Sequence, residues 1–361
     1  MKFIKSVRFY FFTFILTSLF LSLTSCDSFI YEGEGDCTVK YKIRFVYDMN
    51  LKWADAFPSE VKSVNLYVFD SNDLFVKEYR AAGEPLSVPG YEMTLDLPAG
   101  DYHFVAWCGL ENEGAAQESF NVVQPQPGVT TIDELICSLN TLSSRDESAP
   151  EISKKRLYFL YHGYLEANLP DSQDGAEYVY TMYLTKDTNH IRIILQELSS
   201  DEDMNAEDYD IKIEAANGTM AYNNDLLGDT KITYEPWSLV ADYVGVGRID
   251  VDNGEIKYVK GIVADLSTSR MMASQKNNFM LTITRKSDGE TIIARVPVIQ
   301  YALLSRSYYE MAYDHQMTDQ EFLDREDEYV MTFFLEKGKW IDSYIDILQW
   351  RIVIGNYDLG K

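Results

Sequence analysis

Short runs of alternating apolar and polar residues, separated by turn residues, constrain the fold of this chain more than any other feature of its sequence. In the first run, the apolar residues Val39, Tyr41, Ile43, Phe45 and Tyr47 share one face, and charged residues occupy most of the other. A period of two is typical of a strand with one buried face. Such runs recur to the end of the chain, so we predict an all-β protein built from β-sandwiches.

The strands can be placed by the turn residues between them. We expect strands at residues 39–47, 61–69, 74–79, 91–97, 102–107, 157–165, 179–184, 191–195, 209–215, 232–234, 246–251, 256–263, 279–285, 292–298, 329–335 and 345–354. Residues 98–101 (Pro-Ala-Gly-Asp) predict a tight hairpin between the strands at 91–97 and 102–107. Asn253-Gly254 and Asp288-Gly289 predict two more hairpins, because these pairs accept positive φ angles.

The sequence predicts one short helix, near residues 318–327. Thr318 and Glu321 have the spacing of a capping box, in which a hydroxyl and a carboxylate accept hydrogen bonds from free backbone N–H groups. Phe322 and Leu323 follow as the apolar residues of the helix.

The first 26 residues have the pattern of a lipoprotein export signal. Lys2, Lys5 and Arg8 precede an apolar run, residues 9–23, which would span only about 22 Å as a helix against about 30 Å of bilayer hydrocarbon. The run ends in Leu-Thr-Ser-Cys, which resembles the bacterial lipobox. We therefore predict a signal peptide at residues 1–25, cleavage between Ser25 and Cys26, and lipid attachment to Cys26. The alternative is a signal anchor or an ordinary signal peptide with a chance cysteine.

The remaining 336 residues are long for one hydrophobic core and suit two domains. Residues 26–36 are acidic and contain two glycines, as expected of a lipidated tether. A polar stretch at residues 170–177 separates the two halves of the strand pattern. We expect an N-terminal β-sandwich domain at residues 37–175 and a C-terminal one at residues 176–361.

The charge of the chain excludes some classes of partner. The formal net charge is −25, and it becomes −28 when the three cations of the signal peptide leave. A chain this acidic repels nucleic acid, whose binding depends on clustered lysines and arginines. Its charge also gives it no attraction to anionic lipid.

Neither a metal site nor a catalytic site is predicted. His103, His162, His190 and His315 are widely scattered, no C-x-x-C pair occurs, and we expect no cofactor. Motifs of nucleophilic and metal-dependent hydrolases are also missing. A carboxylate hydrolase remains a third hypothesis, which would require a pocket with two facing acids. Cys37, Cys108 and Cys137 are expected to be buried single cysteines, with one disulfide and one free thiol as the alternative.

Two features suggest binding surfaces. The chain contains 26 tyrosines and five tryptophans, and a run such as residues 307–309 (Ser-Tyr-Tyr) could line a glycan-binding surface, although aromatic residues in β proteins more often pack in the core. The C-terminal strand at 345–354 is strongly apolar on one face. It either pairs within its own sheet or takes part in strand addition between subunits.

Several stretches together resemble the fimbrial anchoring-subunit family of Bacteroidales lipoproteins, whose members sit at the base of type V fimbriae. They are residues 54–57, 60–70, 95–107, 321–329 and 337–340, in this order behind the lipobox. The resemblance runs from about Cys37 to the C-terminus. It implies two transthyretin-like Greek-key β-sandwich domains, attachment to the outer membrane by lipid, and a role in anchoring the fimbrium and limiting its length.

The leading hypothesis is therefore a non-enzymatic anchor. Cys26 would hold the lipid in the cell outer membrane, and the domains would engage the first pilin by β-strand addition. The alternatives are a surface lipoprotein that binds glycans and a fimbrial tip or accessory subunit. The sequence identifies neither the partner pilin nor the strand that is donated or accepted.

Overall fold

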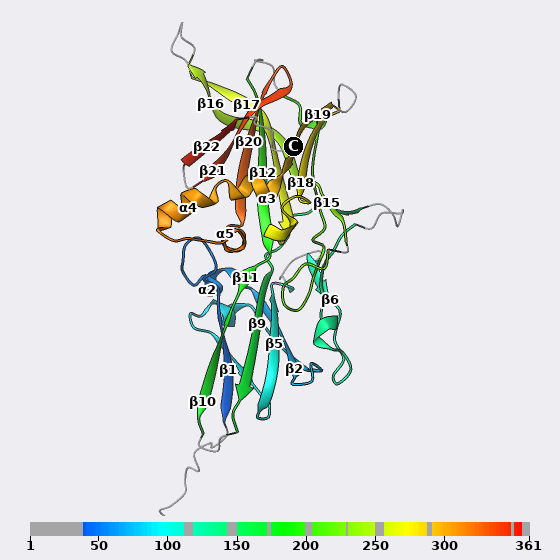
Figure 1. Cartoon of the computed structure of the whole chain (residues 1–361), viewed down its shortest axis with the longest axis vertical. Helices are drawn as coiled ribbons and strands as arrows, with labels where there is room; N and C mark the ends of the chain where they lie inside the picture. The colour runs from blue at the N-terminus through cyan, green and yellow to red at the C-terminus, as the bar shows by residue number, and fades with distance from the viewer. Residues whose placement is uncertain are drawn as a thin grey trace, which may run out of the picture.

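The computed structural model describes residues 39–111, 118–142, 150–171, 175–198, 204–228, 230–249, 256–286, 291–347 and 350–355. Two β-rich units lie end to end along the long axis of the molecule (Figure 1). The expected signal peptide and tether, with Ser25, Cys26 and Cys37, lie outside the described residues. Within the described part of the chain, none of the helices has the length and apolar character needed to cross a bilayer.

The N-terminal unit is a sandwich of two sheets with strand orders β10-β1-β4 and β11-β9-β5-β2-β3. Its strands are β1 (Lys40–Val46), β2 (Ser63–Asp70), β3 (Phe75–Ala82), β4 (Glu92–Leu95), β5 (Gly100–Cys108), β9 (Tyr161–Leu169), β10 (Glu177–Tyr183) and β11 (Thr185–Lys186). The unit also contains the one-turn helix α2 (Phe57–Glu60) and the 3-10 turn η1 (Glu84–Ser87).

The alternation in the first strand places its apolar face in the core, as predicted. Tyr41, Ile43 and Phe45 of β1 are buried and pack against residues of β2 and β5 in the facing sheet, including Leu66 and Phe104. One face of the three-stranded sheet is therefore fixed by a local pattern in the sequence.

The C-terminal unit is a second sandwich, with strand orders β16-β17-β12-β20-β21-β22 and β19-β18-β13-β15-β8. Its strands are β8 (Glu151–Ser153), β12 (Thr188–Glu197), β13 (Tyr209–Ala215), β15 (Ile232–Tyr234), β16 (Ser238–Ile249), β17 (Ile256–Ser269), β18 (Met280–Arg285), β19 (Thr291–Pro297), β20 (Glu328–Glu336), β21 (Lys339–Ile347) and β22 (Trp350–Gly355). Two 3-10 turns, η3 (Ala206–Asp208) and η4 (Ala273–Gln275), connect them.

A small third sheet covers the outer face of the N-terminal five-stranded sheet. It consists of β14 (Thr219–Met220), β7 (Cys137–Leu139) and β6 (Phe120–Val122), and the 3-10 turn η2 (Ile132–Glu134) lies between β6 and β7 in sequence. Tyr67 of β2 and Trp107 of β5 are buried with residues of this third sheet, in one hydrophobic cluster that also contains the core of the C-terminal sandwich. The core of the C-terminal sandwich thus extends over the outer face of the N-terminal five-stranded sheet, while the N-terminal sandwich keeps a separate core between its own two sheets.

The predicted helix is present as α5 (Asp319–Arg325), where the Thr318 hydroxyl accepts a hydrogen bond from the Glu321 N–H at 3.0 Å. The Glu321 carboxylate accepts from Arg325 Nε at 3.0 Å, so Glu321 supports the helix through an i,i+4 pair. Two further helices, α3 (Val298–Leu303) and α4 (Arg306–Tyr313), were not predicted. Residues 298–303 are apolar almost throughout, a pattern that a buried helix shares with a buried strand.

Two strand predictions are wrong. The expected hairpin across residues 98–101 does not form, because β4 pairs with β1 while β5 pairs with β2 and β9 in the facing sheet. The expected strand at 345–354 is divided between β21 and β22, which pair antiparallel within their own sheet. By contrast, the strands on either side of Asn253-Gly254 and of Asp288-Gly289 do pair antiparallel.

Strand pairing crosses the expected division at residues 175 and 176. β10 and β11, which follow that point, pair with β1 and β9 of the N-terminal unit. β8, which precedes it, pairs with β15 of the C-terminal unit. We propose a boundary near Asp187, where the chain leaves β11 and enters β12.

Candidate functional site at the seam and the sheet edges

Two kinds of site are relevant to a protein without catalytic motifs: the contact between its two sandwiches and the open edges of its sheets. The contact, which we call the seam, is formed by Glu60, Lys186, Asp187, Arg270 and residues 324–327. In Figure 1 it lies between the upper and lower units, with α5 close above α2.

Lys186 links the two sandwiches through ion pairs. Its side chain is 5% exposed, and Nζ pairs with Asp327 of the segment after α5 and with Glu60 of α2, the latter at 3.4 Å. The ammonium group also lies 3.5 Å from the centre of the Phe159 ring. A buried cation with two carboxylates and an aromatic face holds a fixed position, because moving it away from the carboxylates would leave a buried charge without compensation.

Asp187 and Arg270 form the most deeply buried contact between ionisable side chains in the described seam. Asp187 is 0% exposed, and its Oδ1 accepts from Asn224 Nδ2 at 2.9 Å and from Arg270 Nη1 at 3.3 Å. Arg270 Nη2 donates to both carboxylate oxygens of Asp324 in α5, at 3.0 and 3.3 Å. Burial raises the pKa of Asp187 to about 8, although Arg270 opposes the shift.

Glu326 is a second buried acid at the seam. Tyr309 of α4 donates its hydroxyl to Glu326 Oε2 at 2.6 Å, while the backbone N–H groups of Asp327 and Glu328 donate to Oε1. Burial raises the pKa of Glu326 to about 7, against the effect of these hydrogen bonds.

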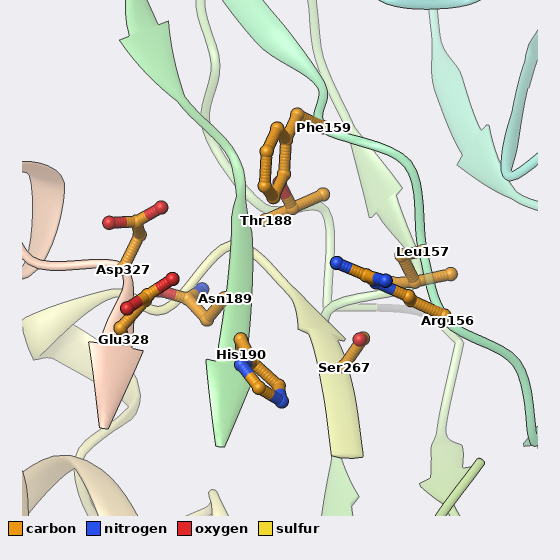
Figure 2. A pocket seen from close by; sticks show the side chains of 9 residues that line it. All are labelled: Arg156, Leu157, Phe159, Thr188, Asn189, His190, Ser267, Asp327 and Glu328. Carbon is orange, nitrogen blue, oxygen red and sulfur yellow. The ribbon is translucent and has the colours of Figure 1, made fainter. Parts of the chain in front are cut away.

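A small pocket opens beside these groups (Figure 2). Its volume of about 40 Å³ suits one or two water molecules and not a sugar or a cofactor. Asp327 and Glu328 lie on one side, His190 on the central strand and Arg156 on the other side. The two acids do not face each other across a space large enough for a glycosidic bond. The pocket therefore lacks the arrangement that a carboxylate hydrolase requires.

A more open hollow of about 360 Å³ lies on the surface near the seam, lined by Trp53, Tyr313, Asp314 and His315. Trp53 and Asp314 both adopt positive φ angles, 53° and 50°. The guanidinium group of Arg325 lies 3.7 Å from the centre of the Trp53 ring, and the His315 ring meets that ring edge to face at 4.5 Å. These contacts hold the tryptophan in place. Tyr308, from the run singled out in the sequence, is 40% exposed on α4, whereas Tyr309 is buried.

The cysteines and histidines behave as structural residues. Cys108 and Cys137 are buried free thiols, as expected, and burial raises the pKa of each. His162 is buried, its Nε2 donates to the Tyr222 carbonyl at 2.7 Å, and burial lowers its pKa to about 3. Among the residues that the structure describes, no three histidine, cysteine or acidic side chains are placed to bind a metal ion.

Most of the described sheet edges carry features that oppose pairing with another chain. The edge strand β3 contains Lys77, Glu78 and Arg80, and its pairing with β2 is irregular. Register shifts interrupt the pairing of β16 and of β19 with their neighbours. β4, β6, β8, β11 and β14 have four residues or fewer. Charge, bulges and shortness are the usual protections of an edge strand.

Two described edges lack these protections, β10 in the N-terminal unit and β22 in the C-terminal one. β10 pairs with β1 over seven residues without a register shift, and its solvent side exposes Val179 (39%) and Tyr183 (62%). β22 pairs with β21 over six residues without a shift and contains one charged residue, Arg351. Figure 1 places both strands at the outer side of their units.

The seam was not anticipated from the sequence. Lys186 and Asp187 are part of a short polar break between two apolar runs, which is the signal of a crossing from one sheet to another. Arg270 and Asp324 are 54 residues apart, and no local pattern relates them. The sequence indicated the helix that carries Asp324, but not what this side chain contacts.

Comparison with known proteins identifies the family. A model of the family described as fimbrillin-A associated anchor proteins Mfa1 and Mfa2 matches residues 34–356. The minor fimbrium anchoring subunit Mfa2 of Porphyromonas gingivalis is 24% identical over 298 residues, which cover 81% of this chain and 80% of that protein.

Solved structures share the fold of this chain. A candidate adhesin from Bacteroides thetaiotaomicron is 33% identical with a TM-score of 0.70, covering 87% of this chain and 97% of that one. A candidate polysaccharide-binding protein from the same bacterium is 27% identical with a TM-score of 0.69, covering 88% and 99%. The fimbrial anchor protein Mfa2 of P. gingivalis shares the fold, with a TM-score of 0.60 at 16% identity, covering 88% and 99%. Because the family model spans almost the whole chain, this protein belongs to the fimbrillin-A associated anchor proteins, a family of non-enzymatic fimbrial anchors.

Proposed function

We propose that this protein attaches a fimbrium to the outer membrane through a lipid on Cys26. The match to the anchor family over residues 34–356 carries the proposal. The lipobox-like sequence at residues 23–26 supports the lipid attachment, since several acyl chains on one cysteine give stable anchoring without a spanning segment. Residues 27–36 then connect the lipid to β1. We propose a transthyretin-like Greek-key topology for each sandwich.

Replacing the lipidated cysteine tests this proposal directly. In Cys26→Ala, we expect the protein to leave the membrane fraction and fimbriae to detach into the medium. Membrane fractionation and electron microscopy of the cells measure the two effects, and Cys108→Ala is a control that removes a buried thiol from β5. Membrane-bound Cys26→Ala protein with cell-attached fimbriae would contradict the lipid anchor.

We also propose that the protein joins the first pilin by β-strand addition and thereby limits fimbrial length. Open sheet edges support strand addition, because backbone hydrogen bonds can supply affinity there. Deletion of the gene is expected to give longer fimbriae in electron micrographs. Immunogold labelling separates an anchor from a tip or accessory subunit: label at the cell-proximal end supports the anchor, and label at the free end contradicts it.

Glycan binding is a second candidate function, favoured by the hollow at Trp53, Tyr313, Asp314 and His315. Aromatic rings can pack against a sugar ring, and a carboxylate can accept from its hydroxyls. The description of one structural relative as a candidate polysaccharide-binding protein agrees with this.

A glycan array followed by calorimetry tests this function. Tyr313→Ala is expected to abolish binding, whereas Tyr308→Ala, which changes an exposed tyrosine outside the hollow, should leave it unchanged. Absence of glycan binding by the unmodified protein, or equal binding by the two variants, would reject this candidate.

A further inference from the structure

We propose that β10 is the edge to which a fimbrial subunit adds an extended segment. This inference rests on the proposed function and goes further, because it names the accepting strand and the chemistry of the segment. Three properties of β10 carry it: the direction of its backbone groups, its lack of protective features, and the side chains that would flank the new strand.

The hydrogen bonds at the two ends of β10 fix the direction of its backbone groups. Lys40 N–H donates to the Ala176 carbonyl, and Leu184 N–H donates to the Val46 carbonyl. The register between these points is uninterrupted. Along a strand, the backbone N–H and C=O groups of successive residues point alternately to one side and to the other. The N–H and C=O groups of the even-numbered residues of β10 therefore point toward β1.

The odd-numbered residues of β10 consequently direct their backbone groups outward. These residues are Glu177, Val179, Thr181 and Tyr183, and the described part of the chain has no strand on that side of the sheet. The outward groups form an unpaired ladder of four residues. Backbone groups that water satisfies at such an edge can instead bond to an added strand.

The backbone of β10 is also held in place before any partner arrives. Tyr180 donates its hydroxyl to the Asn168 carbonyl at 2.6 Å, and Met182 is fully buried in the core of the N-terminal sandwich. A rigid acceptor loses little conformational entropy on binding. β22, the other unprotected edge, carries Arg351 in its second position, whereas residues 178–183 contain no charge.

The side chains of β10 define the partner segment. Its single charge, Glu177, is paired with Lys42 of β1 at 2.8 Å at one end of the strand. Val179 and Tyr183 line the solvent face, and the rings of Tyr178 and Tyr180 lie partly buried on the inner face. The matching segment is an extended, uncharged stretch of about six residues with apolar side chains at alternate positions.

A proline at an outward position tests the edge without removing a bond to β1. In Thr181→Pro the missing N–H is one that points away from β1, and edge strands tolerate proline at such positions. Thr181→Val is the matched control, since it keeps the N–H and suits a strand. The mature chain is immobilised and probed with fimbriae purified from a strain of the same bacterium that lacks the gene for this protein, so that the first pilin is unoccupied. Circular dichroism and melting temperature establish that each variant is folded.

We expect Thr181→Pro to weaken capture of fimbriae about tenfold or more and Thr181→Val to capture them like the unmodified protein. Folded Thr181→Pro that captures fimbriae normally would overturn the assignment of β10 while leaving strand addition at another edge intact. Failure of the unmodified protein to capture fimbriae would instead reject the proposed function, and this inference with it.

Amide hydrogen exchange of the unmodified protein provides a test that needs no variant. On binding, the N–H groups of Val179, Thr181 and Tyr183 are expected to exchange about tenfold or more slowly. Those of Tyr180 and Met182 serve as internal controls, because they already point toward β1. Unchanged exchange at the odd-numbered residues of the captured protein would contradict the proposal even if Thr181→Pro failed to fold.

Discussion

At the scale of single residues, the buried charges of the seam are the most consequential feature. Lys186, Asp187 and Arg270 come from segments that the sequence treats as connections, yet they are among the least exposed charged residues described. Burying such groups costs free energy because they leave water, so their contacts add little net stability. In any other arrangement of the two sandwiches, however, the same groups would be buried without partners, which is strongly unfavourable. Specifying one orientation between domains suits a protein that holds a filament.

The pKa of Asp187 leads to a prediction about the dependence of stability on pH. An aspartate in the unfolded chain ionises near pH 3.9, whereas the native state retains the proton up to about pH 8. The native state therefore binds more protons between these values, so the free energy of unfolding falls as pH rises from about 4 to about 8. Asp187→Asn resembles the protonated acid, and its stability should fall less across this range.

Urea unfolding at several pH values measures the effect. Asp96→Asn, which removes an acid whose side chain is 98% exposed, should follow the unmodified protein. If the free energy of unfolding falls equally with pH in Asp187→Asn and in the unmodified protein, Arg270 keeps Asp187 ionised in the native state.

At the scale of elements, local signals succeeded where the structure is local. The start of α5 depends on a hydrogen bond between Thr318 and Glu321, which are three positions apart in the sequence. The sequence predicted this start correctly. The expected hairpin at residues 98–101 failed for the opposite reason. Its turn residues reverse the chain, but whether β5 returns to the sheet of β4 or enters the facing sheet depends on which faces are buried. Residues 104–108 of β5 are all buried, as in a strand covered on both faces.

The cap of α5 gives a prediction at this scale. Thr318→Ala removes the oxygen that accepts from the Glu321 N–H, and we expect a loss of about 1 kcal/mol in the free energy of unfolding. Thr318→Asn supplies another acceptor at the N-cap and should keep the free energy of unfolding of the unmodified protein. Chemical denaturation of the three proteins compares them, and equal stability of the alanine variant would show that tertiary contacts alone hold the helix.

At the scale of the whole molecule, the apolar cluster of the C-terminal sandwich continues onto the outer face of the N-terminal five-stranded sheet, although the N-terminal sandwich has a core of its own. Trp107 of the N-terminal unit belongs to the same cluster as Ile193 and Phe333 of the C-terminal one. We therefore predict a single cooperative thermal transition, with the calorimetric enthalpy equal to the van't Hoff enthalpy. Differential scanning calorimetry of the mature chain measures both. Two resolved transitions would indicate that the sandwiches unfold independently.

A truncation checks the same conclusion. A fragment of residues 39–186 keeps β6 and β7 but loses β14 and the C-terminal core, so part of the apolar cluster that contains Tyr67 and Trp107 becomes exposed. We expect this fragment to bind a hydrophobic dye and to melt at a lower temperature than the mature chain. A fragment as stable as the mature chain would show that this apolar cluster contributes little.

The sequence by itself determined the features whose physics is local or repeated. Alternation fixed the β class and the buried face of β1, and a capping residue fixed the start of α5. The leader predicts a lipid anchor by the same kind of local pattern. Only the tertiary structure decided which strands share a sheet, which edges stay open, and that Lys186 meets Asp327 across 141 residues. These relations depend on burial shared between distant segments, which no window of the sequence contains.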